Sequence, residues 1–160
     1  MNGYRGGRFK MGGPRRITPG ASAPVSPVKT KRRVLFVCIG NSCRSQMAEG
    51  FARTYGADVM IAASAGTSPA ANIAPLTRQV LAARNVRIDD HFPKDLEIAA
   101  REPFDLIVNM SGQKLPLESS ASIREWSVRD PIGEKESVYQ AVAEQIEGLV
   151  MRLILELRSS

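Results

Sequence analysis

The feature that most constrains the fold is a short apolar run followed at once by a helical pattern. Residues 33–38 (Arg-Val-Leu-Phe-Val-Cys) are rich in β-branched and aromatic side chains, which is typical of a strand buried on both faces of a parallel sheet. A turn over 40–42 follows, and apolar residues then recur at helical spacing as far as Gly56. A parallel sheet of this kind needs helices packed on it, so the segment predicts an α/β fold.

The rest of the chain repeats the alternation of strand and helix. The further elements that the pattern predicts are a strand over 59–63, a turn over 64–67, a helix from Pro75 to a left-handed Asn85, a short helix over 94–101, strands over 104–110 and 123–128, and a last helix with apolar residues from Val138 to Leu157. We therefore expect one α/β domain over residues 32–160, with a parallel sheet and right-handed crossovers.

The positive charge of the chain lies in its first 31 residues. The formal net charge is +6, and residues 1–31 hold seven Lys and Arg side chains and no acidic one, which leaves 15 basic and 16 acidic residues in the remainder. This Gly-, Pro- and Ser-rich segment has no periodicity and is predicted to be a disordered basic tail, with either a solvating role or a weak electrostatic one. The near-neutral remainder argues against nucleic-acid binding.

The number and spacing of the cysteine and histidine residues indicate which cofactors and which cell compartment to expect. The chain has only two cysteines, Cys38 and Cys43, and one histidine, His91. They form neither a disulfide framework nor a zinc pattern, so no metal or other cofactor is expected. No run is long enough to span a membrane and no secretory signal is evident. We therefore expect a cytoplasmic protein without a membrane partner, whose thiols stay reduced.

The segment Cys38-Ile-Gly-Asn-Ser-Cys-Arg-Ser45 lies where a strand ends and a helix begins, which is where open α/β sheets bind ligands. Successive backbone N–H groups and the positive end of the helix can hold a tetrahedral oxyanion there. Glycine permits close backbone approach, asparagine tolerates positive φ, and arginine offers a planar fork of donors. The predicted phosphate-binding residues are Ile39, Gly40, Asn41, Ser42, Cys43, Arg44 and Ser45.

Cys38 is the predicted nucleophile of this loop. The helix N-terminus and Arg44 favour its thiolate form, and the Ser45 hydroxyl can donate to the sulfur. Attack on a phosphate ester would give a phosphocysteine intermediate, and the leaving oxygen then needs an acid. His91 is a poor candidate, whereas Asp130 precedes a proline in a loop after the last predicted strand. We expect Asp130 to act first as the acid and then as the base for the hydrolytic water.

Residues 34–49 (Val-Leu-Phe-Val-Cys-Ile-Gly-Asn-Ser-Cys-Arg-Ser-Gln-Met-Ala-Glu) resemble the low-molecular-weight protein tyrosine phosphatases and the arsenate reductases built on the same fold. That family combines an early Cys, five residues, Arg and Ser or Thr with a late Asp-Pro. The resemblance covers residues 33–157 and implies a four-stranded parallel sheet flanked by helices, with no required metal. It also implies that Ser64 hydrogen-bonds the loop asparagine, Asn41. For Cys43 it implies a reversible disulfide with Cys38, against the alternative of a packing residue below the loop.

Some features of the sequence resemble the arsenate reductases of this family, and others depart from them. Residues 64–69 (Ser-Ala-Gly-Thr-Ser-Pro), the segment up to Lys94 and Trp126 look more like the arsenate reductases. Thioredoxin-coupled arsenate reductases, however, relay a disulfide through two further cysteines, and Ser111 and Glu118 stand at those places here. Arsenate reduction by this chain would therefore need an external thiol.

The leading hypothesis is hydrolysis of phosphate monoesters, with phosphotyrosine-like aryl phosphates on a protein or small molecule as substrates. Ile132-Gly133 follows the Asp-Pro where many eukaryotic members have paired tyrosines. The alternatives are arsenate reduction with an external thiol, or both activities, because arsenate and phosphate are nearly isosteric. A non-catalytic oxyanion-binding or interaction module is a further alternative, against which intact Cys38, Arg44 and Asp130 argue.

Overall fold

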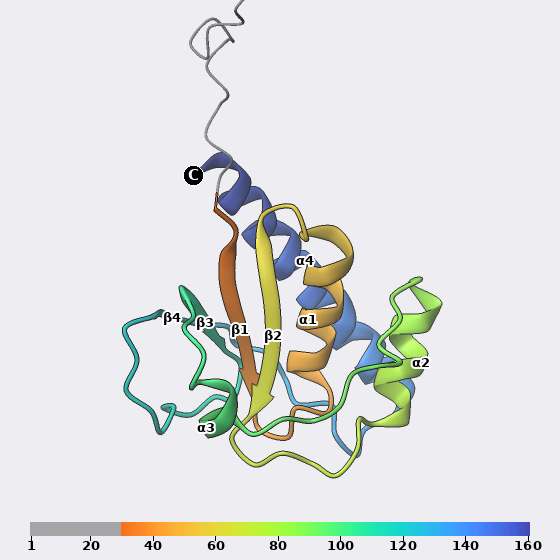
Figure 1. Cartoon of the computed structure of the whole chain (residues 1–160). Helices are drawn as coiled ribbons and strands as arrows, with labels where there is room; N and C mark the ends of the chain where they lie inside the picture. The colour runs from red at the N-terminus through yellow and green to blue at the C-terminus, as the bar shows by residue number, and fades with distance from the viewer. Residues whose placement is uncertain (1–29) are drawn as a thin grey trace, which may run out of the picture.

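The computed structural model describes residues 30–160 and shows a four-stranded parallel sheet with helices packed on it (Figure 1). Its elements are β1 (Arg32–Cys38), α1 (Arg44–Tyr55), β2 (Met60–Gly66), α2 (Pro75–Ala83), α3 (Leu96–Ala99), β3 (Leu106–Asn109), β4 (Ser122–Glu125) and α4 (Glu136–Ser159). The predicted fold class is therefore confirmed. The predicted tail over 1–31 lies outside the described residues, apart from Thr30 and Lys31.

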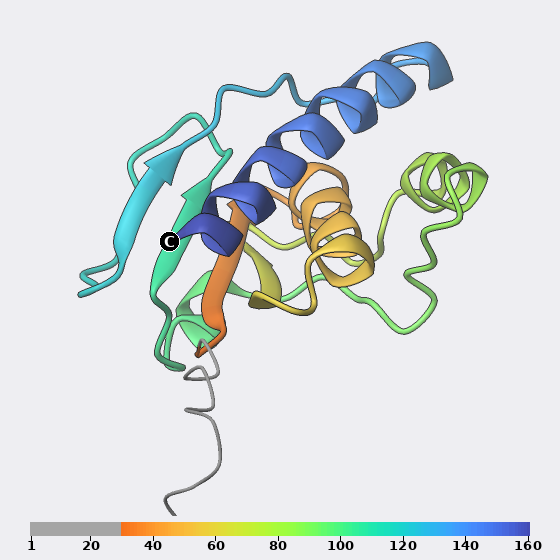
Figure 2. The same ribbon diagram turned by 90° about the horizontal axis from the view of Figure 1, so that it is seen from above.

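The sheet is arranged around β1. Its strand order is β2-β1-β3-β4, and all three pairings are parallel. The last five residues of β1 are buried, as expected for a central strand that is covered on both faces. The view in Figure 2 shows α1 and α4 on one face of the sheet and α3 on the other. The loop after β1 therefore emerges at the middle of the carboxyl edge of the sheet.

Alternate residues of β1 supply two separate hydrophobic cores. Phe36 faces α1 and α4 in the larger core, and its ring centroid lies 5.9 Å from that of Trp126. Leu35 and Val37 face the other way, into a smaller core that includes Leu96 of α3. The larger core thus fixes α1, the helix that follows the loop, against the strand that precedes it.

The structure confirms some predicted boundaries and corrects others. The α2 helix begins at Pro75, and Asn85 follows it with φ of +61°. The predicted turn over 64–67 is wrong in its first part, because residues 64–66 continue β2. They do so because β1 pairs with β2 as far as Cys38 opposite Gly66. The two last strands are shorter than predicted and end before the loops that carry site residues.

Among the described helices, none is both long and apolar enough to cross a membrane.

Gly66 offers a direct test of how β2 supports the loop. A Cβ atom at this position would lie 2.5 Å from the Ile39 carbonyl oxygen and 2.9 Å from the Asn41 nitrogen. Since both are backbone atoms of the loop, Gly66→Ala must displace it, and we expect a loss of about 1–3 kcal/mol in unfolding free energy. Urea denaturation measures this loss.

Gly148→Ala is the matched control for that substitution. Gly148 lies in α4, and an added Cβ atom there meets nothing within 4 Å. This variant should gain about 0.5–1 kcal/mol, because alanine is the better helix former. Equal stabilities of the two variants would contradict the close approach of Gly66 to the loop.

Candidate active site

A cavity of about 230 Å³ lies at the carboxyl end of β1. Its lining residues are Cys38, Ile39, Gly40, Ser42, Cys43, Arg44, Ala70, Asp130 and Ile132. The structure therefore brings the three predicted catalytic residues, Cys38, Arg44 and Asp130, to one cavity, although the third comes from a loop 86 residues beyond the second along the printed sequence.

The loop between Cys38 and Arg44 is held by its carbonyl groups. The carbonyl oxygens of residues 38, 39 and 40 accept from the backbone N–H groups of Thr67, Ser68 and Ala70, at 3.1, 2.9 and 2.9 Å. Asn41 adopts φ of +49°, the left-handed conformation that its residue type tolerates. Within the described residues, the N–H groups of residues 40–43 have no protein acceptor. Such a run of free donors ahead of α1 forms a site for an anion.

Arg44 is fixed by two carbonyl groups and keeps one donor unused. Its Nη1 donates to the carbonyl oxygens of Met110 and Val128, at 2.6 and 3.1 Å, just beyond β3 and β4. Its Nη2 lies 3.5 Å from Asp130 Oδ2. The guanidinium is buried, and its Nε has no partner among the described residues. Leaving a buried charged donor unsatisfied is costly. The unsatisfied Nε therefore indicates that the cavity binds an anionic ligand.

The direction of the hydrogen bonds at the sulfur follows from one backbone group. The N–H of Lys94 donates to Asn41 Oδ1 at 2.9 Å, and a backbone N–H can only donate. The amide group of Asn41 is thereby oriented, so its Nδ2 donates to Ser45 Oγ at 2.7 Å. The Ser45 hydroxyl proton is then free for Cys38 Sγ, 2.8 Å away. A hydrogen bond donated to a cysteine sulfur in this way favours its nucleophilic form.

Cys43 also lines the cavity, and its sulfur contacts α4. Its sulfur lies 3.7 Å from the hydroxyl of Tyr139 in α4, and both side chains are buried. Burial raises the pKa of the Cys43 thiol, while hydrogen bonds with Thr77 and Tyr139 lower it less. Both cysteines are free thiols in this structure. A redox partnership between Cys43 and Cys38 stays a prediction.

The hydrogen bond that the resemblance implied from Ser64 to Asn41 is replaced by another. Ser64 Oγ donates instead to Glu49 Oε1 at 2.6 Å, and Asn41 is held by Ser45, Gln46 and Lys94. Sequence reasoning missed Gln46 and Glu49. The available signal was their spacing of three residues, which places two polar side chains on one side of a helix, and the structure shows both buried. His91 lies in the loop before α3 and is buried against these two residues.

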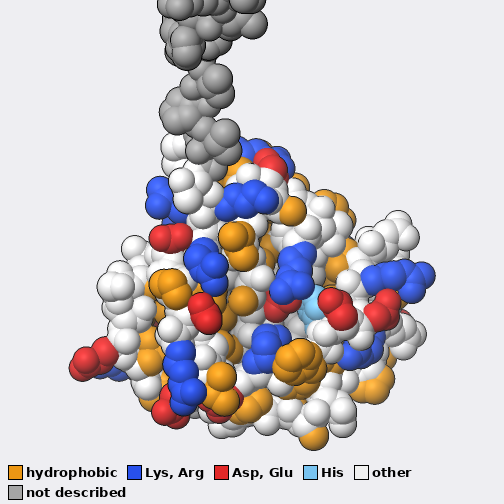
Figure 3. All heavy atoms as spheres, in the orientation of Figure 1, with side chains coloured by type: hydrophobic (Ala, Val, Ile, Leu, Met, Phe, Trp, Pro, Cys, Tyr) orange, Lys and Arg blue, Asp and Glu red, His pale blue; other side chains and the backbone are white. Residues whose placement is uncertain are grey.

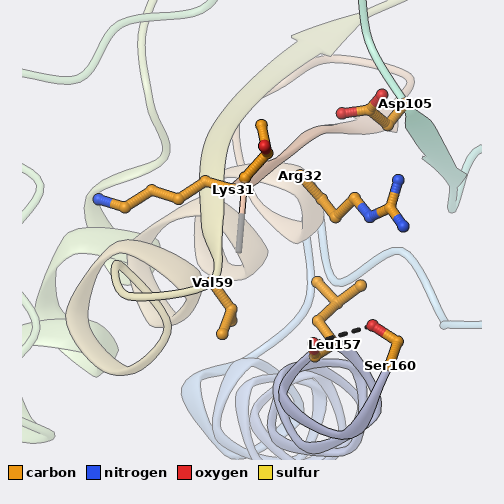
Figure 4. A pocket seen from close by; sticks show the side chains of 7 residues that line it. Lys31, Arg32, Val59, Asp105, Leu157 and Ser160 are labelled. Atoms are coloured by element: carbon orange, nitrogen blue, oxygen red, sulfur yellow. Dashed lines mark hydrogen bonds between the residues drawn. The ribbon is translucent and has the colours of Figure 1, made fainter. Parts of the chain in front are cut away.

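A second hollow, of about 360 Å³, lies at the opposite edge of the sheet. Figure 4 shows Arg32 and Asp105 at the amino ends of β1 and β3, with Val59, Leu157 and Ser160 around the same hollow. None of the predicted site residues lines it. Ligands of parallel sheets bind at the carboxyl edge, so the smaller cavity at Cys38 is the candidate active site. No group of three metal-ligating side chains occurs within residues 30–160.

Comparison with known proteins agrees with this geometry. The family model described as low molecular weight phosphotyrosine protein phosphatase matches residues 33–160. A glutaredoxin arsenate reductase of Synechocystis is 30% identical over 130 residues, which cover 79% of this chain and 98% of that protein. An arsenate reductase solved in its phosphate-binding state is 30% identical with a TM-score of 0.73, over 79% of this chain and 98% of that one.

A phosphatase is found at the same level of similarity. The solved low-molecular-weight protein tyrosine phosphatase from T. tengcongensis is 30% identical with a TM-score of 0.67, and the match covers 79% of this chain and 99% of that one. The family model covers the sheet and its helices from Arg33 onward, including the Cys38 loop and the Asp130 loop. The chain belongs to the low-molecular-weight phosphotyrosine protein phosphatase family.

Proposed function

We propose that this protein reduces arsenate, with Cys38 as the nucleophile and a thiol from outside the chain as the reductant. The observation that carries the proposal is the unpartnered, buried Nε of Arg44, in a cavity where the sulfur of Cys38 is hydrogen-bonded to the Ser45 hydroxyl. A tetrahedral oxyanion satisfies that nitrogen and the free loop amides together. The relatives support arsenate as this oxyanion, because most of those named above are arsenate reductases.

The reaction proceeds in two balanced steps. The Cys38 thiolate forms a bond to arsenic(V), and one arsenate oxygen leaves as water after protonation, with Asp130 as the proton donor. An external thiolate then attacks the Cys38 sulfur, and the electron pair of the sulfur–arsenic bond stays on arsenic, which leaves as arsenite. Cys38 is now in a mixed disulfide, which a second thiol reduces.

The number and the positions of the cysteines support an external reductant. The sequence contains only Cys38 and Cys43. The segment after β3 has Ser111 in place of a thiol, and its hydroxyl donates to Asn109 Oδ1 at 2.6 Å in a tight turn. Cys43 points to Tyr139, and its raised pKa keeps it in the poorly nucleophilic thiol form. The name of the Synechocystis relative includes glutaredoxin, which is a protein of the thiol class required here.

Hydrolysis of phosphate monoesters is the second candidate, and the position of Asp130 favours it. Its carboxylate lines the cavity, keeps about half of its side chain exposed, and accepts from the N–H of Ile132 at 3.1 Å. A carboxyl group so placed can protonate an ester oxygen and then activate water. The phosphatase relative supports the same chemistry. One site could perform both reactions, because each begins with attack of Cys38 on a tetrahedral oxyanion.

The first experiment compares the two activities in the wild type and in Cys38→Ser. Arsenite formation is measured with glutathione, with and without glutaredoxin, and p-nitrophenyl phosphate hydrolysis is measured with a chelator present. We expect thiol-dependent arsenite formation that Cys38→Ser abolishes, since serine is far less nucleophilic. Hydrolysis without arsenite formation would make the phosphatase the correct choice. If the wild type shows neither activity, the remaining alternative is a non-catalytic oxyanion-binding module.

Asp130→Asn tests the proton donor. Asparagine keeps the size of the side chain but cannot give up a proton, so hydrolysis of phenyl phosphate should fall by about 10²-fold or more. The loss should be smaller for p-nitrophenyl phosphate, whose leaving group needs less protonation. Steady-state kcat values for the two esters provide the measurement. Equal losses for both esters would mean that Asp130 acts through its charge beside Arg44.

Cys43→Ala tests whether the second thiol takes part. Arsenite formation with glutathione should stay close to the wild-type rate, because the external thiol attacks Cys38 directly. Urea denaturation controls for the small buried cavity that the substitution leaves, which costs about 1 kcal/mol. If the variant binds arsenate but forms no arsenite, Cys43 resolves the adduct and the reductant is not wholly external.

A further inference from the structure

The segment that leaves β3 is folded around a buried asparagine. Charged side chains of both signs lie over the face of the molecule that Figure 3 shows, where water solvates them. Asn109, the last residue of β3, has instead an exposed fraction of 0%. A buried amide is costly unless its hydrogen-bonding positions have partners. Neither reaction proposed above assigns a role to this residue, so its burial at the end of the strand needs an explanation of its own.

Two backbone groups fix the orientation of the Asn109 amide. The N–H of Ser111 donates to Asn109 Oδ1 at 2.9 Å, and Asn109 Nδ2 donates to the Gln113 carbonyl oxygen at 2.7 Å. A backbone N–H can only donate and a carbonyl oxygen can only accept, so both ends of the amide are assigned. The Ser111 hydroxyl also donates to Oδ1, at 2.6 Å, and Nδ2 also donates to Glu125 Oε1, at 3.2 Å. All four hydrogen-bonding positions of the amide are therefore filled.

These bonds close a tight turn over residues 109–113, in which Gly112 adopts φ of +76°. The carbonyl oxygen of Met110 lies inside this turn and accepts from Arg44 Nη1 at 2.6 Å. The amide of Asn109 holds the backbone on both sides of Met110. It thereby fixes the direction of the carbonyl group that Arg44 uses.

Asn109 also binds the segment that supplies the second acceptor of Arg44. Its carbonyl oxygen accepts from the N–H of Trp126 at 2.9 Å, and its Nδ2 bonds Glu125, the last residue of β4. The carbonyl oxygen of Val128, in the same short segment, accepts from Arg44 Nη1 at 3.1 Å. Both carbonyl groups that hold Nη1 therefore belong to segments that Asn109 joins.

The position of Nη1 determines where the rest of the guanidinium lies, because the group is planar and rigid. Both hydrogen atoms of Nη1 are used by the two carbonyl groups. Nη2 then lies 3.5 Å from Asp130 Oδ2, and Nε is buried without a partner among the described residues. A shift of either carbonyl group would move both nitrogens of Arg44 away from the positions in which an oxyanion can meet them.

We propose that Asn109 is a positioning residue for Arg44: it joins the segments after β3 and β4, and so sets the two carbonyl groups that orient the guanidinium for a tetrahedral oxyanion. The inference rests on the proposed function, in which Arg44 binds that oxyanion, but not on the choice between arsenate and phosphate. Cys38 lies outside this arrangement, since its sulfur is hydrogen-bonded to Ser45. Substitution of Asn109 should therefore weaken oxyanion binding and leave the reactivity of the sulfur unchanged.

Inorganic phosphate is the probe for oxyanion binding. Its dissociation constant is measured by isothermal titration calorimetry for the full-length wild type, Asn109→Ala and Ser111→Ala. We expect phosphate to bind about ten-fold more weakly to Asn109→Ala, because a misplaced donor loses much of its contribution. Ser111→Ala keeps the amide and removes only the hydroxyl, so its loss should be smaller. Wild-type affinity in both variants would overturn the proposal.

The reactivity of Cys38 separates a specific role from a general loss of structure. The rate at which iodoacetamide modifies Cys38, followed by mass spectrometry, should stay within about two-fold of the wild-type rate in Asn109→Ala, because the Ser45 contact is untouched. Urea denaturation checks that the variant is folded, and Ser111→Ala provides the test if it is not. A parallel loss of alkylation and phosphate binding would mean that the whole loop is disrupted, and would overturn the positioning role.

Gln145→Ala is the matched control for these substitutions. Gln145 Nε2 donates to the Ser127 carbonyl oxygen at 3.0 Å, in the same segment after β4, but its side chain is exposed. Water can replace an exposed hydrogen bond, so phosphate should bind this variant as tightly as the wild type. A loss equal to that of Asn109→Ala would contradict the proposal, since any loosened contact with the segment would then weaken the site.

The order of Arg44 can be observed without a ligand. The ¹⁵N NMR relaxation of its Nε–H group, assigned by its absence in Arg44→Lys, reports how mobile the guanidinium is. We expect an ordered group in the wild type and a mobile one in Asn109→Ala. This result in a protein that binds neither phosphate nor arsenate would support the positioning role and refute the proposed function. An equally ordered Arg44 in both proteins would refute the positioning role alone, whatever the activity.

Discussion

The hydrogen bond from the Lys94 backbone N–H to the side-chain oxygen of Asn41 is the constraint on which the site depends. The donor and the acceptor of each further hydrogen bond can be assigned from it, because a backbone N–H group can only donate. Asn41 must then donate to Ser45, and Ser45 can offer its proton to Cys38. The left-handed backbone of Asn41 is held by the same bond, so loop shape and sulfur chemistry share one cause.

The site joins segments that the sheet brings to one edge. The β1 strand delivers Cys38, α1 delivers Arg44, and the loop after β4 delivers Asp130. Arg44 unites them, because the carbonyl groups that hold it follow β3 and β4. A ligand that completes the coordination of Arg44 therefore also stabilises the association of three strands.

Much of this could be predicted from sequence, and the remainder could not for a physical reason. The Cys38 loop, the buried strand before it and the distant Asp130 are local patterns with defined chemistry, and the structure places them in one cavity. The end of β2 was missed because strand pairing, and not the turn-like composition of residues 64–66, decides it. The partners of Gln46 lie 45 and 46 residues away in the sequence, and no periodic pattern encodes such contacts.

The loop carbonyls are held by main-chain donors, and this has a consequence for how the site can vary. Thr67, Ser68 and Ala70 contribute only their backbone N–H groups to the bonds that shape the loop. Their side chains are therefore free to change without disturbing the anion cradle. Ala70 is the informative position, since it also lines the mouth of the cavity. The residue at this rim can therefore be exchanged, and with it the size of the substrate that the cavity admits, while the loop beneath is preserved.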